Sequence, residues 1–482
     1  MAMLKGKVES KYFAYAFATI CTFVILVVSY ISLSNRFLWF DEAGQLWISL
    51  GLNHFSAPFS PRGTLLDVLQ NNSFYNMDPG GFSVLLSLWS LVSTNIIFVR
   101  TFPFLLFLGF CILLSIITKN ETKSTFLSIF VFTLPFVLPY LTNKVAEVRG
   151  YGMEEFGVFI SVYLLMRIKQ KTTYTRILML GIVLAFFCTS RYSFILFSLA
   201  ISFRLFTILL QEGTDKRRVL AYTTLYAIPL IVMVGLIYFY MMSVQNGGAK
   251  KLHYGGYILS EPQLLISPMS FLFYANIIYL VYLSKNKKRI PEIMLVAVLV
   301  GIVFFVASCA DKYPWSTIRT MPVFALLVFS LCISFFVNTN IKIGPMRLAL
   351  TLTTLSLFAF WITFYKELHK AEVQANEEME EFIDYIDKAP KQKYYVVSYY
   401  NPMIRCYFEM GQGNKDNAFY PEKLYLQKAK KFAFSINDRY KDKGPDEVEA
   451  DIYFMPQDWP VKKRKDYTLL EGRKFLYTRL SN

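Results

Sequence analysis

Two adjacent carboxylates, Asp41 and Glu42, stand directly after the first long apolar segment of the chain, in the run WFDEA. An ionised carboxylate near hydrocarbon is costly unless it faces a polar cavity, so acids at a membrane boundary are candidates for chemistry. Such a group can act as a general base that removes a proton from a hydroxyl group. The structural alternative is that Asp41 caps a helix over residues 42–52 and complements its dipole.

Adjacent carboxylates also suit Mg²⁺ or Mn²⁺, but two ligands do not define a metal site. The six cysteines form no CxxC motif and no cluster with histidine, so neither a zinc site nor a disulfide framework is indicated. We therefore predict no metal site and no other cofactor, with a divalent cation beside Asp41 and Glu42 as the open alternative.

The composition is that of a membrane protein. Of 482 residues, 55% are hydrophobic and 17% aromatic, which is more apolar than a soluble domain of this size. Apolar runs of about 20 residues, enough to cross a bilayer, recur between Tyr12 and Tyr365. The net charge of +16 does not indicate nucleic-acid binding, because residues 366–482 carry 21 Lys and Arg against 20 Asp and Glu. The excess lies in residues 1–365, where basic loops set the orientation of the helices.

We predict an all-α polytopic bundle of eleven membrane spans. They are expected over residues 12–33, 98–118, 124–141, 155–167, 177–189, 192–210, 219–242, 268–283, 290–309, 319–337 and 346–365.

The connections between these spans fall into two alternating classes. The basic class holds 18 Lys and Arg in 52 residues and the other class holds 8 in 105 residues. Because basic loops stay in the cytoplasm, the N-terminus is expected inside and the C-terminal segment outside. The basic class comprises residues 1–11, 118–124, 167–176, 211–218, 284–289 and 338–347.

Strict alternation requires that the apolar run Phe82–Ile97 does not cross the membrane by itself. The run contains four serines and a threonine, and Trp89 suits an interfacial position. We interpret it as a juxtamembrane or re-entrant helix. If it crosses, the number of spans is twelve and the orientation of all later segments is reversed.

Two domains are expected. Residues 1–365 form the membrane domain, with a long first outer loop over residues 34–81. Residues 366–482 form a small soluble α/β domain outside the membrane, with a helix near Lys370–Lys388 and strands at Tyr394–Tyr400, Asp451–Met455 and Lys474–Arg479.

The predicted outer face carries further acids and a few cations. Asp78 precedes the Phe82 helix and either contributes to a site or caps that helix. Glu147 and Arg149 either belong to a site or simply pair with each other. Arg191 and Arg319 are notable because arginine binds phosphate through two parallel hydrogen bonds, and basic residues are scarce on this face.

These motifs, in this order, resemble glycosyltransferase family 39 of the GT-C superfamily, which includes protein O-mannosyltransferases and aminoarabinose transferases. The resemblance covers residues 35–330 approximately and does not include the C-terminal segment. It rests on five features of the sequence: the Asp41-Glu42 opening of the first outer loop, the Pro79 motif that leads a helix with Trp89, Arg100-Thr-Phe-Pro103, Glu147-x-Arg149-x-Tyr151 and Ser316-Thr-Ile-Arg319-Thr-Met-Pro322. Many relatives have His or Lys and a second Pro where this chain has Asp78-Pro79-Gly80.

The resemblance implies a membrane enzyme that transfers a sugar from a polyprenyl-phosphate donor to an acceptor hydroxyl or other nucleophile, outside the cytoplasm and with inversion. The acceptor would be a glycan, a lipid or a protein. We assign Asp41 as base and Glu42 as the residue that orients the acceptor or the loop. The expected substrate-binding residues are Asp78, Glu147, Arg149, Tyr151, Arg191 and Arg319.

Two other functions fit the composition. A lipid or oligosaccharide transporter or flippase would place its acids and bases near the middle of broken helices, whereas the residues above gather at one predicted face. A membrane scaffold would use Asp41 only as a cap. The expected location of the protein is the inner (cell) membrane of a bacterium, among membrane lipids.

Cysteine labelling tests the eleven-span topology. Cysteines introduced at Ser124 and at Lys285 are both expected on the cytoplasmic side, because both positions lie in basic loops. An impermeant thiol reagent should therefore leave both unlabelled in intact cells and label both after permeabilisation. Labelling of both in intact cells would refute this topology.

Overall fold

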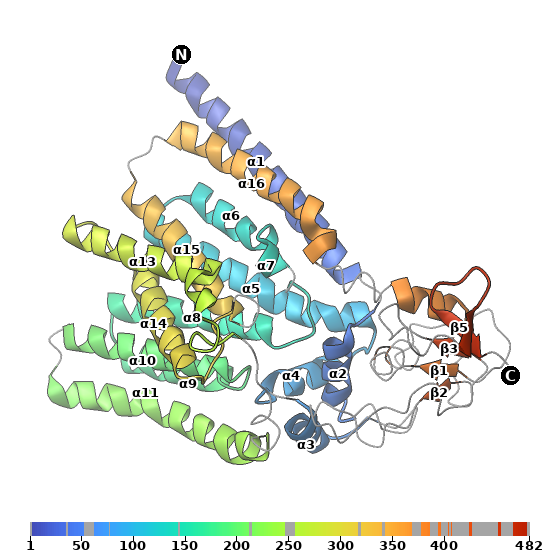
Figure 1. Ribbon diagram of the computed structural model, residues 1–482. Helices are drawn as coiled ribbons and strands as arrows, with labels where there is room; N and C mark the ends of the chain where they lie inside the picture. The colour runs from blue at the N-terminus through green and yellow to red at the C-terminus, as the bar shows by residue number, and fades with distance from the viewer. Residues whose placement is uncertain are drawn as a thin grey trace. The chain divides into compact units, whose positions relative to one another are not determined.

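The computed structural model of the chain is mostly helical, with one small sheet in the C-terminal segment (Figure 1). It describes residues 2–34, 37–52, 62–76, 78–142, 145–211, 215–245, 256–316, 320–339, 343–368, 377–385, 394–396, 403, 406, 424–426, 452–454 and 466–479.

Contacts divide the chain into two compact units. Unit 1 comprises Met1–Ser34, Pro103–Ser243 and His253–Phe364, and unit 2 comprises Asn35–Phe102, Val244–Leu252 and Tyr365–Asn482. The predicted domain boundary after residue 365 stays a prediction.

Unit 1 is built from helices, and each of the eleven predicted spans overlaps one of them. Its elements are α1 (Ala2–Ser34), most of α5 (Ile96–Thr122), α6 (Thr125–Thr133), η1 (Leu134–Phe136), α7 (Pro139–Thr142), α8 (Tyr151–Gln170), α9 (Tyr174–Phe187), α10 (Ser193–Gln211), α11 (Lys216–Ile237), the π-helical η2 (Tyr238–Met242), η3 (Pro262–Ile266), α13 (Pro268–Lys285), α14 (Glu292–Cys309), α15 (Met321–Asn338) and α16 (Ile343–Leu368).

Six helices in the described part of the chain are long and apolar enough to cross a membrane. They are Tyr15–Ser34, Ile96–Thr122, Ser193–Gln211, Lys216–Gln245, Glu292–Cys309 and Met321–Asn338. Three shorter apolar helices cover Thr125–Phe136, Tyr174–Phe187 and Met346–Ile362. The prediction of a mostly helical fold with helices that are long and apolar enough to cross a membrane is therefore confirmed, whereas the predicted number of eleven spans is not.

Close packing and exposed apolar faces coexist in unit 1. A Cβ atom on Gly181 of α9 would lie 2.5 Å from the backbone oxygen of Tyr226, so only glycine allows α11 to approach this closely. The opposite side of α11 is exposed, with Ile228 57% and Ile231 68% accessible. Helices that pack on one side and expose large apolar side chains on the other are suited to a lipid environment.

An ion-pair network joins one end of four helices. Arg204 on α10 donates through Nε and Nη2 to the two carboxylate oxygens of Glu292 on α14, and Lys169 on α8 donates to the same carboxylate at 2.8 Å. Arg289 pairs with Glu121, near the end of α5, at 2.7 Å. The network brings together residues from three of the predicted basic segments, 118–124, 167–176 and 284–289.

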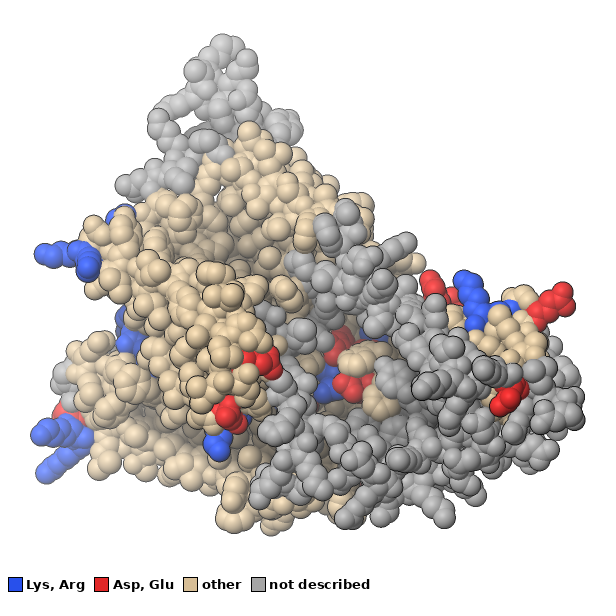
Figure 2. Space-filling view, in the orientation of Figure 1, with Lys and Arg blue, Asp and Glu red and all other residues tan. Residues whose placement is uncertain are grey.

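More basic side chains are exposed where α11 begins and where α13 ends, as the left edge of Figure 2 shows. These are Lys216, Arg217, Arg218, Lys285, Lys287 and Lys288. Membrane helices of this kind keep such charged ends in water.

Unit 2 contains three short helices ahead of α5, namely α2 (Phe40–Ser49), α3 (Leu65–Tyr75) and α4 (Gly81–Trp89). Helix α4 has nine residues, a length of about 14 Å against the roughly 30 Å of a hydrocarbon core. Turns at residues 90–92 separate it from α5. The run Phe82–Ile97 is thus broken into two helices, as expected for a segment that does not cross the membrane alone.

Arg62 fastens the chain ahead of α3 to the end of α4. Its Nη2 donates to the hydroxyls of Ser87 at 2.9 Å and Ser90 at 3.1 Å, and to the carbonyl of Ser87. A cation at a helix C-terminus complements the helix dipole. Because Arg62 lies just ahead of α3 and binds the end of α4, the contact also joins the two ends of the hairpin that α3 and α4 form.

The C-terminal segment of unit 2 holds a five-stranded sheet in the order β2-β1-β3-β5-β4. The first three strands in that order are parallel and the last pairings are antiparallel. The strands are β1 (Tyr394–Val396), β2 (Leu424–Leu426), β3 (Ile452–Phe454), β4 (Tyr467–Leu469) and β5 (Leu476–Arg479). Three of them lie in the predicted strand regions, and β2 and β4 were not predicted.

A helix packs on this sheet, and a cysteine of the same segment contacts α2 within unit 2. Residues 377–385 are helical, and Phe382 stacks on Phe454 of β3 with ring centroids 4.6 Å apart. The thiol of Cys406 lies 3.8 Å from the backbone oxygen of Ala43 on α2. The α/β character predicted for this segment is confirmed for its described residues.

Loss of the Arg204–Glu292 pair should destabilise unit 1. In Arg204→Leu the buried Glu292 carboxylate loses two charge-assisted bonds, and breaking a buried pair typically costs about 3–5 kcal/mol. Lys169→Met is the control, because Lys169 is 48% exposed and an exposed partner contributes about 1 kcal/mol or less. Unfolding of the purified protein in detergent measures both, and equal losses would contradict this ranking.

Candidate functional site

The first turn of α2 gives the two adjacent carboxylates different environments. The helix begins at Phe40 with Trp39 as N-cap, and the backbone N–H of Trp39 donates to Glu42 Oε2 at 3.2 Å. Asp41 lies within the first turn, so the predicted cap is wrong, whereas the predicted placement of an acid at the positive end of the helix dipole is confirmed. It is half-buried, whereas Glu42 is 1% exposed.

Glu42 is paired with a buried arginine. Arg100 Nη2 lies 2.8 Å from Glu42 Oε2 and also donates to the backbone oxygen of Phe37 at 2.9 Å. Both charged side chains are at most 5% exposed. The pair therefore ties the start of α2 to α5, and supports the part of the prediction in which Glu42 orients the loop.

Buried amides join α2, α3 and α4 behind the acidic pair. Gln45 Nε2 donates to Ser83 Oγ at 2.7 Å, and Ser83 Oγ donates to Asn72 Oδ1 at 2.7 Å. Asn76 Nδ2 donates to Gln45 Oε1 and to Asn72 Oδ1, each at 3.0 Å. Because buried amides are costly when unpaired, this network fixes the three helices relative to one another.

The same network holds the Asp78 turn. Asn72 Nδ2 donates to the backbone oxygen of Asp78 at 2.8 Å, and Gln245 Nε2 lies 3.3 Å from that oxygen. Gly80 has φ +93°, and a Cβ there would lie 2.9 Å from Asn72 Nδ2. Gly80 is the N-cap of α4, without a side-chain cap, so the alternative that Asp78 caps this helix is wrong.

In unit 1, a second cluster forms around Arg191, between α9 and α10. Its guanidinium carbon lies 4.2 Å from the centre of the Tyr151 ring, and Nη1 lies 3.4 Å from Glu154 Oε2. Glu154 is fully buried, and its Oε1 accepts a short hydrogen bond from Ser193 Oγ. We call Tyr151, Glu154, Arg191, Ser193 and Tyr313 the Arg191 cluster.

Tyr313 completes this cluster from the loop after α14. It is hydrogen-bonded to Ser193, and it lies close enough to Arg191 and Glu154 for their charges to change its pKa. Burial raises the pKa of Tyr313 to about 12, and Arg191 opposes that rise. The phenol therefore keeps its proton at neutral pH and remains a hydrogen-bond donor.

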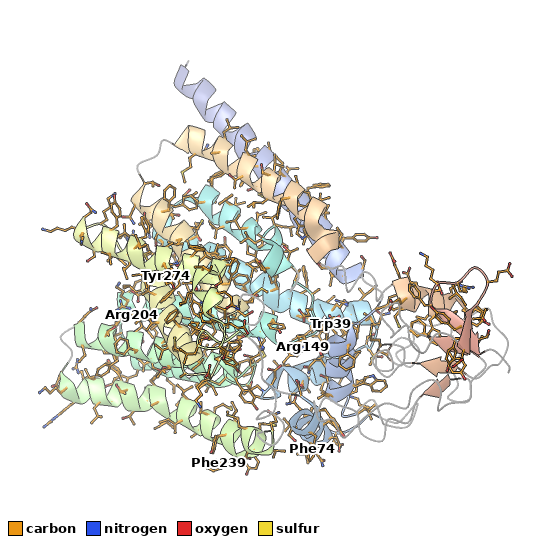
Figure 3. The ribbon with its side chains drawn as sticks, in the orientation of Figure 1. Trp39, Phe74, Arg149, Arg204, Phe239 and Tyr274 are labelled. Atoms are coloured by element: carbon orange, nitrogen blue, oxygen red, sulfur yellow. The ribbon has the colours of Figure 1, made fainter. Side chains whose placement is uncertain are left out.

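The turn before α8 carries the next predicted residues. Glu147 is 7% exposed and Arg149 is half-buried, and the backbone N–H of Arg149 donates to Glu147 O at 2.7 Å. Figure 3 labels Arg149 at this turn. Arg319 lies outside the described residues.

The structure thus brings Glu147, Arg149, Tyr151 and Arg191 into unit 1, and Asp41, Glu42 and Asp78 into unit 2. Within the described ranges, no group of three or more His, Cys, Asp or Glu side chains could hold a metal ion. Glu42 is engaged by the Arg100 cation, which competes with a divalent ion for the same carboxylate.

Sequence reasoning missed the residues that support the predicted ones. Glu154, Ser193 and Tyr313 surround Arg191, and Arg100 is the partner of Glu42. One signal was available, since Arg100 is a charge within a predicted span and such residues normally have a specific partner.

A scan against models of protein families finds no match to the chain, and a search of curated proteins finds none either. The resemblance to glycosyltransferase family 39 therefore rests on the motifs alone.

The two adjacent carboxylates should differ in their effect on stability. Glu42→Gln leaves the buried Arg100 without its anion and should cost about 3–5 kcal/mol. Asp41→Asn, one residue away and half-buried, should change the free energy of unfolding by about 1 kcal/mol or less. Unfolding of the two purified variants in detergent, under the same conditions, checks this ranking. A larger loss of unfolding free energy for Asp41→Asn than for Glu42→Gln would contradict it.

Proposed function

We propose that this protein is a membrane glycosyltransferase that moves a sugar from a polyprenyl-phosphate donor to an acceptor hydroxyl or similar nucleophile on the extracytoplasmic face. The observation that carries the proposal is that the adjacent carboxylates of Asp41 and Glu42 have different environments. Glu42 is buried and paired with Arg100, whereas Asp41 lies on the first helical turn with part of its surface accessible. The motif order described above supplies the reaction class.

In this proposal Asp41 is the general base. Its carboxylate takes the proton of the acceptor hydroxyl while the acceptor oxygen forms a bond to the anomeric carbon of the sugar. The bond between that carbon and the phosphate oxygen breaks, and the phosphate leaves with the electron pair. Attack from the face opposite the leaving group inverts the anomeric centre. A positioned base contributes about 10²–10⁴-fold to such a step.

The Arg191 cluster and Arg149 are assigned to the donor phosphate. A guanidinium stacked on an aromatic ring keeps a fixed plane, and this favours paired hydrogen bonds to phosphate oxygens. Arg191 stacks in this way on Tyr151. Arg319 and Glu147 are retained as proposed substrate contacts on the motif resemblance.

The proposed topology has eleven spans, with the N-terminus in the cytoplasm and the C-terminal segment outside. It adds α8, α13 and the three shorter apolar helices to the six long ones. The gathering of basic segments in the ion-pair network of unit 1 supports a cytoplasmic assignment for that end.

Asp41→Asn should abolish transfer while the protein stays folded, with a rate loss of about 100-fold or more. The matched control is Asp67→Asn, because Asp67 also lies in the first turn of its helix and accepts hydrogen bonds only from Thr64 in that cap. Purified variants reconstituted in sealed liposomes, supplied with polyprenyl-phosphate sugars and candidate acceptors, give the comparison. Retained activity in Asp41→Asn would contradict the assignment of Asp41 as the general base. Passage of the donor across the bilayer without sugar transfer would indicate a flippase.

A further inference from the structure

Glu154 is an acid in the Arg191 cluster for which the proposed chemistry has no direct use. It lies in the first turn of α8 and is fully buried. A buried carboxylate is costly unless donors and cations compensate it. Its two oxygens accept from two different groups, Ser193 through Oε1 and Arg191 through Oε2.

These two contacts act on the same short segment. Arg191 lies in the turn ahead of α10 and Ser193 is the first residue of that helix, and the backbone oxygen of Arg191 accepts from Phe194 N–H at 3.0 Å. Glu154 thus holds both the turn and the side chain that the turn carries. The Tyr151 ring, three residues earlier on α8, covers the face of the same guanidinium at 4.2 Å.

A second pair in unit 1 shows what a different geometry does. The Glu292 carboxylate accepts from Arg204 through both of its oxygens, and both side chains are at most 7% exposed. Arg191 is 13% exposed, and its Nη1 lies 3.4 Å from one oxygen of Glu154. In the first geometry two nitrogens of the guanidinium pair with both carboxylate oxygens, and in the second Nη1 lies against one oxygen of a carboxylate whose other oxygen accepts from Ser193.

We infer that Glu154 is a positioning residue that, together with Tyr151, sets the plane of the Arg191 guanidinium for an anionic phosphate group. This inference rests on the proposed function for the identity of the ligand, but the restraint on Arg191 is a property of the cluster itself. Glu154→Gln keeps the size of the side chain and removes its charge, so it releases Arg191 and leaves the hydrogen bond to Ser193 possible.

Two measurements on the full-length protein in nanodiscs test the inference. The first is the rate at which phenylglyoxal modifies Arg191, followed by mass spectrometry of the peptide that contains it. The second is the dissociation constant for polyprenyl phosphate without a sugar. In Glu154→Gln we expect both the rate and the dissociation constant to rise about tenfold, the effect of losing one hydrogen bond to a charged group.

Glu121→Gln is the matched control, because Glu121 is also a buried glutamate paired with an arginine, Arg289. It should leave the labelling of Arg191 and the binding of polyprenyl phosphate unchanged. Ser193→Ala, which keeps the charge of Glu154, should give a smaller increase in both quantities and serves if Glu154→Gln does not fold. Glu154→Asp should restore part of the loss.

The outcomes separate this inference from the proposed function. Unchanged labelling of Arg191 in Glu154→Gln and Ser193→Ala would overturn the positioning role, whatever the ligand. Faster labelling with unchanged binding of polyprenyl phosphate, or a wild-type protein that does not bind it, would retain the restraint on Arg191 and reject Arg191 as a donor contact.

Discussion

A carboxylate buried among apolar helices persists as an anion only where cations and hydrogen-bond donors surround it. Glu42, Glu154 and Glu292 are each at most 3% exposed, and each lies against an arginine. These pairs determine where the helices must meet, because each joins segments far apart in the chain. Packing of apolar side chains fills the space around them but does not by itself select those meeting points.

The three pairs differ in what they leave accessible. Glu292 and Arg204 enclose each other and hold one end of unit 1, and Glu42 and Arg100 enclose each other at the start of α2. The second pair leaves the adjacent Asp41 half-buried rather than enclosed. Arg191, which contacts Glu154 and stacks on Tyr151, is also partly accessible. In each unit, therefore, a buried ion pair adjoins or includes a partly accessible side chain to which the proposed reaction assigns a role: Asp41 in unit 2 and Arg191 in unit 1.

Much of the helical architecture could be predicted from the sequence. The positions of the helices follow from the length of the apolar runs, and the short helix α4 follows from the polar and turn residues that interrupt the Phe82–Ile97 run. Asp41 could be singled out because an acid beside hydrocarbon is rare. The strands β2 and β4 could not, since neither Leu424–Leu426 nor Tyr467–Leu469 lies in a run of β-branched and aromatic residues like the one over Tyr394–Tyr400 that contains β1.

The sequence by itself determined a helical protein with segments long and apolar enough to span a membrane, a basic and a less basic class of connections, and an acidic pair after the first apolar run. Only the tertiary structure decided that Glu42 pairs with Arg100 and that Tyr151 and Glu154 contact Arg191. The physical reason is that hydropathy and charge class are properties of local segments, whereas an ion pair needs two atoms within about 4 Å. Arg100 and Glu42 are 58 positions apart and Arg191 and Glu154 are 37 apart, and no local pattern encodes such a distance.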